Sequence, residues 1–167
     1  MSAYFSECRT WRYSLTREVA PLTGEGTVSF IGLNPSTADA TTDDPTIRRC
    51  IRFARDWGFA RLKMLNLYAY RATTPRELKR ASDPVGPDND HVLALAVGFS
   101  DLIVCAWGMN ADAERAGRVL AFYAAPHCLG VTKDGMPRHP LYVRANARPV
   151  PFASCPQMAA YVSEVSR

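Results

Sequence analysis

Residues 27–57 read TVSFIGLNPSTADATTDDPTIRRCIRFARDW and combine a strand pattern, a polar loop and a helix pattern. The apolar run over 27–33 is typical of a short buried strand. After the loop, apolar side chains recur at helical spacing, an acidic residue precedes Pro45 as a cap, and Gly58 follows the last turn; these features predict a helix over 44–57. A buried strand that leads through a loop into a helix is the repeating unit of parallel α/β sheets.

The chain from residue 58 onward alternates between strand and helix patterns in the same way. Apolar runs predict three more strands, and segments with apolar residues at helical spacing predict four more helices. The predicted strands are 61–70, 101–107 and 127–132, and the predicted helices are 74–81, 91–99, 111–124 and 156–165. Strands that are apolar on both faces and separated by helices indicate a parallel sheet covered on both sides.

The first twenty residues follow a different pattern. Residues 4–19 alternate between polar and apolar side chains, which is typical of an edge strand or a hairpin. Trp11, Tyr13 and Leu15 lie on one side of this pattern, and Arg12, Ser14 and Thr16 lie on the other. We therefore predict a single α/β domain over 1–167, a three-layer αβα sandwich around a mostly parallel four-stranded sheet, with an N-terminal strand or hairpin added at an edge.

The composition is that of a folded protein with a mildly basic surface. The chain has 167 residues, of which 47% are hydrophobic and 22% charged, with a formal net charge of +4 and a pI near 8.9. This balance argues against disorder and permits a phosphate-bearing partner, but the positive charge is sparser than in dedicated nucleic-acid-binding proteins. The five cysteines show no CxxC spacing, so we expect reduced, mostly buried thiols rather than disulfides, a metal site or an iron–sulfur site.

The sequence also lacks several recognisable targeting and cofactor signals. Its start, MSAYFSECRTWRY, has neither the basic segment nor the apolar core of a signal peptide, and no run reaches membrane-spanning length. We therefore expect a cytoplasmic protein without a membrane partner. The glycine patterns of ATP-binding and dinucleotide-binding loops are absent from the sequence, so we expect no cofactor.

Polar or aromatic residues follow every strand of the predicted parallel sheet. Ligands of such sheets bind at the carboxyl ends of the strands, so we expect these side chains to line a shared pocket. The first strand is followed by Asn34, Pro35, Ser36 and Thr37, and the second contributes Asn66, Tyr68, Tyr70 and Arg71. The third is followed by Trp107 to Asn110, and the fourth by Lys133 to Gly135 and then Arg138, His139 and Pro140.

Four motifs in this order carry a resemblance to a known superfamily. They are GLNPS at 32–36, NLYAYR at 66–71, CAWGMNA at 105–111 and RHPLY at 138–142. The set resembles the uracil-DNA glycosylase superfamily over roughly residues 27–145. More narrowly, GLNPSTAD, DDPT and the pattern GxPxHPLY look like a bacterial domain of unknown function, number sixteen-forty-three.

The resemblance implies a glycosylase-like hydrolase that cleaves the N-glycosidic bond of a nucleobase-containing substrate, either a small molecule or a nucleic acid. Cleavage builds positive charge on the sugar and negative charge on the leaving base. Asn34 would orient water and His139 would donate to the base, as the two catalytic residues, while Asn66 would read the base edge. The predicted substrate-binding residues are Pro35, Ser36, Asn66, Tyr68, Arg71, Trp107 and Arg138. Because an amide is a weak base, Asp39, Asp43 or Asp44 is a candidate for supplying charge, and the spacing does not choose among them.

The chain also departs from that superfamily at positions that matter for DNA. Its DNA-reading members follow His-Pro with Ser and another Pro, where this chain has Leu141 and Tyr142. The position of a base-stacking aromatic after the first loop holds Pro45, Thr46 and Ile47, which leaves Tyr68, Tyr70 and Trp107 as alternatives. We therefore expect a nucleobase-containing substrate presented otherwise than by flipping from a duplex.

Other interpretations of the same residues stay open. The leading alternative function is a non-catalytic module that holds a nucleotide or nucleic acid in the same pocket, and another is an unrelated hydrolase or transferase on a similar sheet. Asn34 can serve as a turn residue bonded to backbone, and Tyr68 and Tyr70 can serve as packing residues. Arg71 can pair with a helix terminus instead of gripping a phosphate. The arginines of the 44–57 helix can form a solvated face.

Overall fold

The computed structural model describes residues 1–20, 22–36 and 38–152, and within them the chain forms one mixed seven-stranded sheet with four α-helices. The strands are β1 (Ser2–Phe5), β2 (Arg12–Glu18), β3 (Glu25–Gly32), β4 (Phe59–Asn66), β5 (Leu102–Cys105), β6 (His127–Cys128) and β7 (Val150–Pro151). The helices are α1 (Pro45–Asp56), α2 (Pro75–Arg80), α3 (Asn89–Leu95) and α4 (Ala113–Leu120), with short 3-10 turns η1 (Ala96–Gly98) and η2 (Pro140–Tyr142). Among these helices, none is long and apolar enough to cross a membrane.

The strand order is β1-β2-β4-β3-β5-β6-β7, and the prediction of a four-stranded sheet is wrong in its strand number. The four predicted strands do form the centre, because β3 pairs in parallel with β4 and β5, and β5 pairs in parallel with β6. The predicted N-terminal strand or hairpin is a hairpin, β1 and β2, antiparallel to β4. At the far edge β7 adds a short antiparallel strand whose two residues are too few to show a pattern in the sequence. The predicted helix at 156–165 lies outside the described residues.

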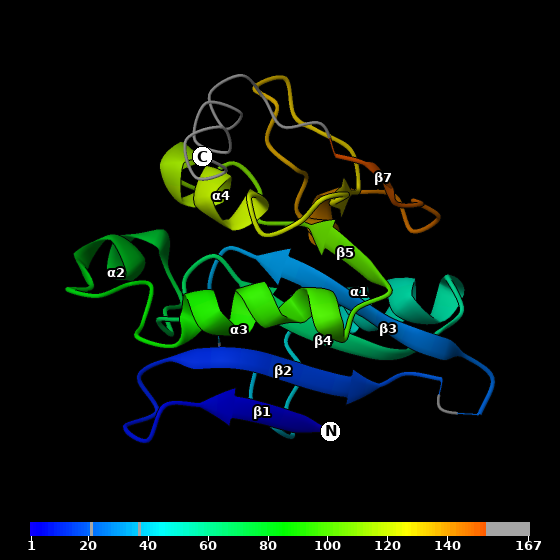
Figure 1. Cartoon of the computed structure of the whole chain (residues 1–167), viewed down its shortest axis with the longest axis horizontal. Coiled ribbons are helices and arrows are strands. Elements are labelled where there is room, and N and C mark those ends of the chain that lie inside the picture. Colours follow the sequence, from blue (N-terminus) through cyan, green and yellow to red (C-terminus); the bar gives the residue numbers. More distant parts are fainter. Residues whose placement is uncertain (21, 37, 153–167) are drawn as a thin grey trace.

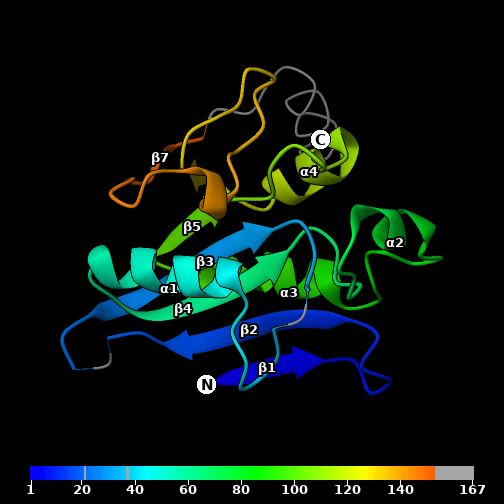
Figure 2. The same cartoon turned by 180° about the vertical axis from the view of Figure 1, so that it is seen from behind.

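Helices cover both faces of the sheet. Strand residues of alternate parity point to opposite sides, so that Phe30 and Leu62 pack with α1, whereas Ile31 and Leu65 pack with α3 and α4. Figure 1 shows α3 in front of the sheet, and Figure 2, seen from behind, shows α1 in front. The central strands are therefore buried on both faces toward their carboxyl ends, which explains the successive apolar residues Phe30–Ile31 and Met64–Leu65.

Helix α1 begins and ends close to the predicted 44–57. The carboxylate of Asp44 accepts a hydrogen bond from the Ile47 amide at 2.8 Å, and Pro45 occupies the first turn, where its missing N–H costs nothing. On its inner face Phe53 stacks on Trp57, whose ring in turn stacks on Phe30. Each fully buried apolar side chain of this interface stabilises the fold by about 1.5–3 kcal/mol.

Strand β2 is not the edge of the sheet, since β1 pairs with its outer side and β4 with its inner side. Pairing within the sheet does not bury the faces of β2, and the covering comes from the loop before α1. Arg12 is 2% exposed and donates to the Ala38 carbonyl of that loop. Arg17 is 1% exposed and bonds to Asp39 and Asp43 of the same loop.

The described cysteines are free, and the prediction that most of them are buried is confirmed. Cys50, Cys105 and Cys128 are buried and Cys8 is exposed, whereas Cys155 lies outside the described residues. Burial raises the pKa of Cys50 and of Cys105, so that these thiols stay protonated and pack as small apolar groups.

The order in which successive parallel strands are added to the sheet reverses at β3. From β3 the chain crosses to β4 on one side and later returns to β5 on the other. A crevice forms outside the carboxyl ends of the strands at such a reversal, because the two loops leave toward opposite faces. In this protein those loops are the one after Gly32 and the one after Cys105.

Candidate functional site

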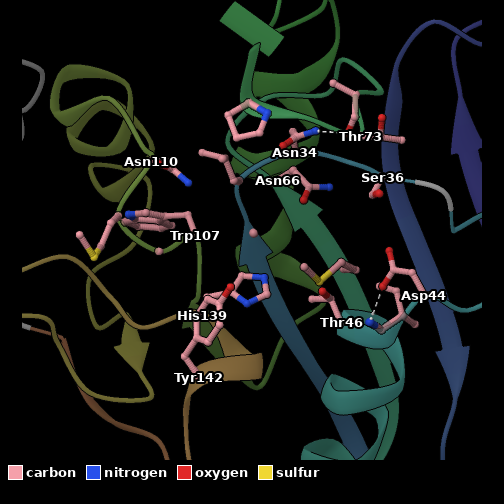
Figure 3. A pocket seen from close by; sticks show the side chains of 18 of the residues that line it. Asn34, Ser36, Asp44, Thr46, Asn66, Thr73, Trp107, Asn110, His139 and Tyr142 are labelled. Atoms are coloured by element: carbon pink, nitrogen blue, oxygen red, sulfur yellow. Dashed lines mark hydrogen bonds between the residues drawn. The ribbon is translucent and has the colours of Figure 1, made fainter. Parts of the chain in front are cut away.

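A cavity of about 700 Å³ lies at the carboxyl ends of β3, β4 and β5. Its walls bring together segments that are far apart in the chain, as Figure 3 shows for the labelled side chains. Of the residues predicted from the sequence, Asn34, Ser36, Asn66, Trp107, Arg138 and His139 line it. Other lining residues include Arg12, Gly32, Asp44, Thr46, Ile47, Met64, Asn110 and Tyr142. A cavity of this size holds a ligand as large as a nucleotide.

Three residues predicted to bind substrate do not belong to the cavity wall. Pro35 is buried, and its carbonyl accepts a hydrogen bond from the Ala72 amide at 3.0 Å, so this residue fixes the loop. Tyr68 packs against the core on the α3 side. The guanidinium of Arg71 lies 5.3 Å from the centre of the Phe5 ring, toward the N-terminal hairpin.

Asn34 has one half of its amide committed to the loop. Its Nδ2 donates to the carbonyl oxygens of Pro35 at 2.9 Å and Ala72 at 2.8 Å. Because both partners are acceptors, they fix which end of the amide is nitrogen. Oδ1 then faces away from them, and no donor among the described residues bonds to it. Asn34 therefore presents an acceptor to the cavity.

Asn66 ends β4 as a buried amide with free hydrogen-bonding capacity. The residue is 1% exposed and lines the cavity, and its Nδ2 is buried without a hydrogen-bond partner among the described residues. In Figure 3 its amide lies between Asn34 and Thr46. An unpaired buried amide costs about 1–3 kcal/mol. This cost is recovered when a ligand supplies one acceptor and one donor side by side.

Gly32 makes room for that amide. A Cβ at this position would lie 2.9 Å from Oδ1 of Asn66 and 2.7 Å from the terminal methyl of Met64. Only glycine therefore allows the Asn66 side chain to lie over the end of β3. The glycine of GLNPS thus has a packing reason, independent of any special backbone angle.

The backbone around Asn66 is held by two buried side chains. Asn89, with no exposed surface, donates from Nδ2 to the carbonyls of Asn66 at 3.1 Å and Leu67 at 3.0 Å. Arg115 donates from Nε to the same Leu67 carbonyl at 2.8 Å. These donors bind carbonyls at the end of β4, where the amides of Leu67 and Tyr68 bond to Gly32 and Leu33, so Asn89 helps to position Asn66 directly and Arg115 does so through Leu67.

The tautomer of His139 is fixed by a hydrogen bond to one of its ring nitrogens. Its Nδ1 lies 3.3 Å from the Leu141 amide and accepts the N–H, so the neutral ring carries its proton on Nε2. Burial lowers the pKa of His139 below its usual 6.5, and the Asp44 carboxylate opposes this shift. At neutral pH the ring is an uncharged donor, and Figure 3 shows it turned toward the cavity between Trp107 and Thr46.

Gly108 lets the loop after β5 approach that histidine. Its φ of +76° is one that side chains rarely adopt, and a Cβ there would lie 3.4 Å from the His139 Cβ. The Gly108 amide also donates to the carbonyl of Pro137 at 3.0 Å. These contacts join the Trp107 loop to the His139 loop across the parallel sheet.

The structure distinguishes among the three candidate aspartates. Asp39 accepts from the amides of Thr41 and Thr42, which closes its own turn. Asp43 pairs with Arg17 at 2.8 Å. Asp44 alone of the three lines the cavity, with one oxygen capping α1 and the other without a partner among the described residues.

Arg12 is the charged cavity residue that the sequence did not indicate, and Thr46, Ile47, Met64 and Tyr142 were also not predicted. Arg12 alternates with apolar neighbours, as a surface residue of a strand does, and nothing local in the sequence indicated that the loop before α1 would cover it. Buried beside the cavity, it donates from Nη1 to the Ala38 carbonyl at 2.5 Å. Desolvation lowers the pKa of Arg12 to about 10, so the group stays charged at neutral pH.

Residues 12–141 match the family described as Protein of unknown function (DUF1643). The chain belongs to this family. The matched DUF1643 region starts at Arg12 and includes every cavity residue named above except Tyr142, so the cavity is a feature of the family segment. Comparisons with curated proteins and with solved structures found no match.

The DUF1643 cavity offers hydrogen-bonding groups rather than metal ligands. Within the described residues, no group of three or more His, Cys, Asp or Glu side chains could hold a metal ion. What the cavity combines is a neutral imidazole donor, three amides, one carboxylate and two guanidinium groups, of which that of Arg12 is buried. Such a set suits recognition of a polar heterocycle and its sugar.

Proposed function

We propose that this protein is an N-glycosidase, a hydrolase of the bond between a nucleobase and its sugar, related to the uracil-DNA glycosylase superfamily. The observation that carries the proposal is the meeting of Asn34, Asn66 and His139, from two loops and the end of β4, in one cavity of about 700 Å³. The presence of Asp44 in the same cavity adds the charge that an amide cannot supply.

His139 is suited to stabilise the leaving base. Cleavage leaves negative charge on the base, and a neutral Nε2–H can donate to a base carbonyl without first losing a proton. The lowered pKa of His139 keeps this form populated at neutral pH. The hydrogen bond from the Leu141 amide to Nδ1 fixes the tautomer that the role requires.

Asn66 is suited to read the base edge. Its amide can donate from Nδ2 and accept at Oδ1, which matches a ring edge with an adjacent carbonyl and N–H. The unpartnered Nδ2 supports this role, because the chain leaves unsatisfied the donor that such a base would fill. The hydrogen bonds from Asn89 to the carbonyls of Asn66 and Leu67 hold the backbone of Asn66 in place.

Asn34 and Asp44 are suited to act on water and sugar. The Asn34 Oδ1 accepts a hydrogen bond from the attacking water and orients it, and the Asp44 carboxylate stabilises the positive charge that builds on the sugar. The water oxygen bonds to the anomeric carbon, and the electron pair of the C–N bond leaves with the base. The proton lost by water passes to Asp44 and then to the base, so the products are a sugar with a new hydroxyl and the free base.

A second candidate is a non-catalytic module that binds a nucleotide in the same cavity. One observation favours it: the Nδ2 of Asn34 is bonded to two loop carbonyls, as in a residue kept for structure. The two candidates predict the same binding and differ only in turnover.

The test measures base release by chromatography from nucleosides, nucleotides and uracil-containing oligonucleotides. We expect release by the wild type and a fall of about 100-fold or more in the His139→Ala variant, because one general acid or oxyanion donor contributes that much. His127→Ala is the matched control, since His127 bonds to Ala125 outside the cavity. Saturable binding of these compounds without release of the base from any of them would refute the glycosidase proposal and favour the non-catalytic binding module.

A further inference from the structure

Two buried arginines on β2 differ in how the protein satisfies them. Arg17 bonds through all three nitrogens, from Nε to Asp43 at 2.8 Å, from Nη1 to the Thr16 carbonyl at 3.1 Å and from Nη2 to the Asp39 carbonyl at 2.6 Å. Arg12 makes one bond, to the Ala38 carbonyl, and its Nε is buried with no partner among the described residues.

Arg12 therefore carries a buried charge that the described chain leaves incompletely paired. A buried cation is costly unless an anion and hydrogen-bond acceptors surround it. Arg17 is not part of the cavity lining and has both, whereas Arg12 lines the cavity with one carbonyl acceptor and no salt bridge among the described residues. The missing acceptors are ones that a ligand can bring.

The N-terminus of α1 lies at the same cavity. The Thr46 amide stands in the first turn of this twelve-residue helix, where no intrahelical acceptor exists, and the helix dipole favours an anion there. The hydroxyls of Ser36 and Thr46 have no hydrogen-bond partner among the described residues and line the cavity. Figure 3 shows both residues with Asp44 on the side next to β2, across the cavity from Trp107.

We infer that Arg12, Ser36 and the start of α1 form a subsite for a terminal phosphate, so that the substrate is a nucleoside monophosphate. The nucleobase part of this inference rests on the proposed function. The base would lie between Asn66 and His139, the sugar beside Asn34 and Asp44, and the phosphate at Arg12. With 2% of its surface exposed, Arg12 is reached only by a group that enters the cavity, which excludes an internal phosphate of a duplex.

Asp44 is the group that opposes an anion at this position. The negative charges of Asp44 and Asp39 raise the pKa of Arg12, whereas the positive charges of Arg71 and Arg17 lower it. Removing the Asp44 charge should therefore tighten phosphate binding while it slows hydrolysis. A purely structural role for Asp44 would not move these two quantities in opposite directions.

The experiment measures the affinity of the four common ribonucleosides and of their 5′-monophosphates by calorimetry. We expect the monophosphate of the preferred base to bind at least about tenfold more tightly than its nucleoside, the typical effect of charge-assisted hydrogen bonds. Arg12→Met should reduce this preference to less than about threefold, whereas the matched buried control Arg17→Met should keep it. Ribose 5-phosphate should compete with the monophosphate for the wild type.

Equal affinity of the wild type for nucleoside and monophosphate would overturn the inference, as would an unchanged preference in folded Arg12→Met. If Arg12→Met does not fold, Asp44→Asn decides: tighter monophosphate binding supports the subsite, and unchanged or weaker binding contradicts it. A 5′-phosphorylated oligonucleotide that binds better than the monophosphate would overturn the assignment of a mononucleotide.

Chromatography of the same samples separates this inference from the proposed function. A phosphate preference without base release would refute the glycosidase and leave the phosphate subsite standing. Base release from nucleosides and monophosphates at equal efficiency would refute the subsite and leave the glycosidase standing.

Discussion

Replacing Gly32 by alanine tests whether Asn66 is held for a ligand. The new Cβ would lie 2.7 Å from the Met64 methyl and 2.9 Å from the Asn66 Oδ1. Met64 ends in a flexible thioether that can turn away, but Asn66 is buried, and its backbone is fixed by Asn89. The amide must therefore move by a few tenths of an ångström.

Two free-energy changes follow from that displacement. Overpacking costs about 1–3 kcal/mol, and the loss of glycine's freedom in the unfolded chain offsets about 0.4–1 kcal/mol of it. We therefore expect Gly32→Ala to lower the free energy of unfolding by up to about 2.5 kcal/mol. A misplaced bidentate amide forfeits about 1–3 kcal/mol of binding, which corresponds to a loss of affinity between about fivefold and 150-fold.

Urea denaturation measures the first change, and calorimetric titration with the preferred nucleotide measures the second. Gly98→Ala is the control, because a Cβ at Gly98 meets nothing within 4 Å and its stability should change by less than about 0.5 kcal/mol. Gly32→Ala and Asn66→Ala should not be additive in affinity, since both act through one amide. Additive losses, or unchanged affinity in Gly32→Ala, would refute the role given to Asn66.

Three further outcomes are expected. Asp44→Asn should lower the pKa of His139 further, because the Asp44 charge raises it, and NMR titration of the imidazole measures this shift. Since burial holds the pKa of His139 below 6.5, its stabilising contribution should be fully present above about pH 6.5 and be lost as the pH falls through the lowered value; a His139→Ala variant should lack this dependence in denaturation measured across that range. Asn89→Ala should lower the free energy of unfolding by about 1–3 kcal/mol, because the Asn66 carbonyl loses its donor, and denaturant titration tests this value.

The central part of the fold could be predicted because burial on both faces leaves an unmistakable trace in sequence. Near their carboxyl ends β3 and β4 carry successive apolar residues, Phe30–Ile31 and Met64–Leu65, and α1 shows helical spacing with a capping aspartate and a proline. The position of the cavity followed from the rule that ligands bind at the carboxyl ends of parallel strands. Residues after those strands, such as Asn34 and Trp107, do line it.

Arg12 could not be recognised because its burial depends on a neighbour and not on its own strand. The alternation of β2 is typical of a strand with one solvent-facing side, but the loop before α1 packs over Arg12, whose guanidinium donates to the Ala38 carbonyl. This contact joins residues that are 26 positions apart in the chain, and local patterns do not encode it.

Asn34, Asp44 and His139 explain why structural and functional interpretations of one residue were hard to separate in the sequence. Each uses one polar atom to hold nearby backbone: Nδ2 of Asn34 on Pro35 and Ala72, Oδ1 of Asp44 on Ile47, and Nδ1 of His139 on Leu141. Each keeps its other polar atom free of partners among the described residues. The first bond orients the side chain, so the free atom is pre-organised for a ligand. Truncation to alanine removes both atoms at once, whereas Asp44→Asn keeps the capping oxygen and changes only the free end. Loss of hydrolysis in Asp44→Asn with unchanged helix stability would therefore separate the two roles that the sequence joins.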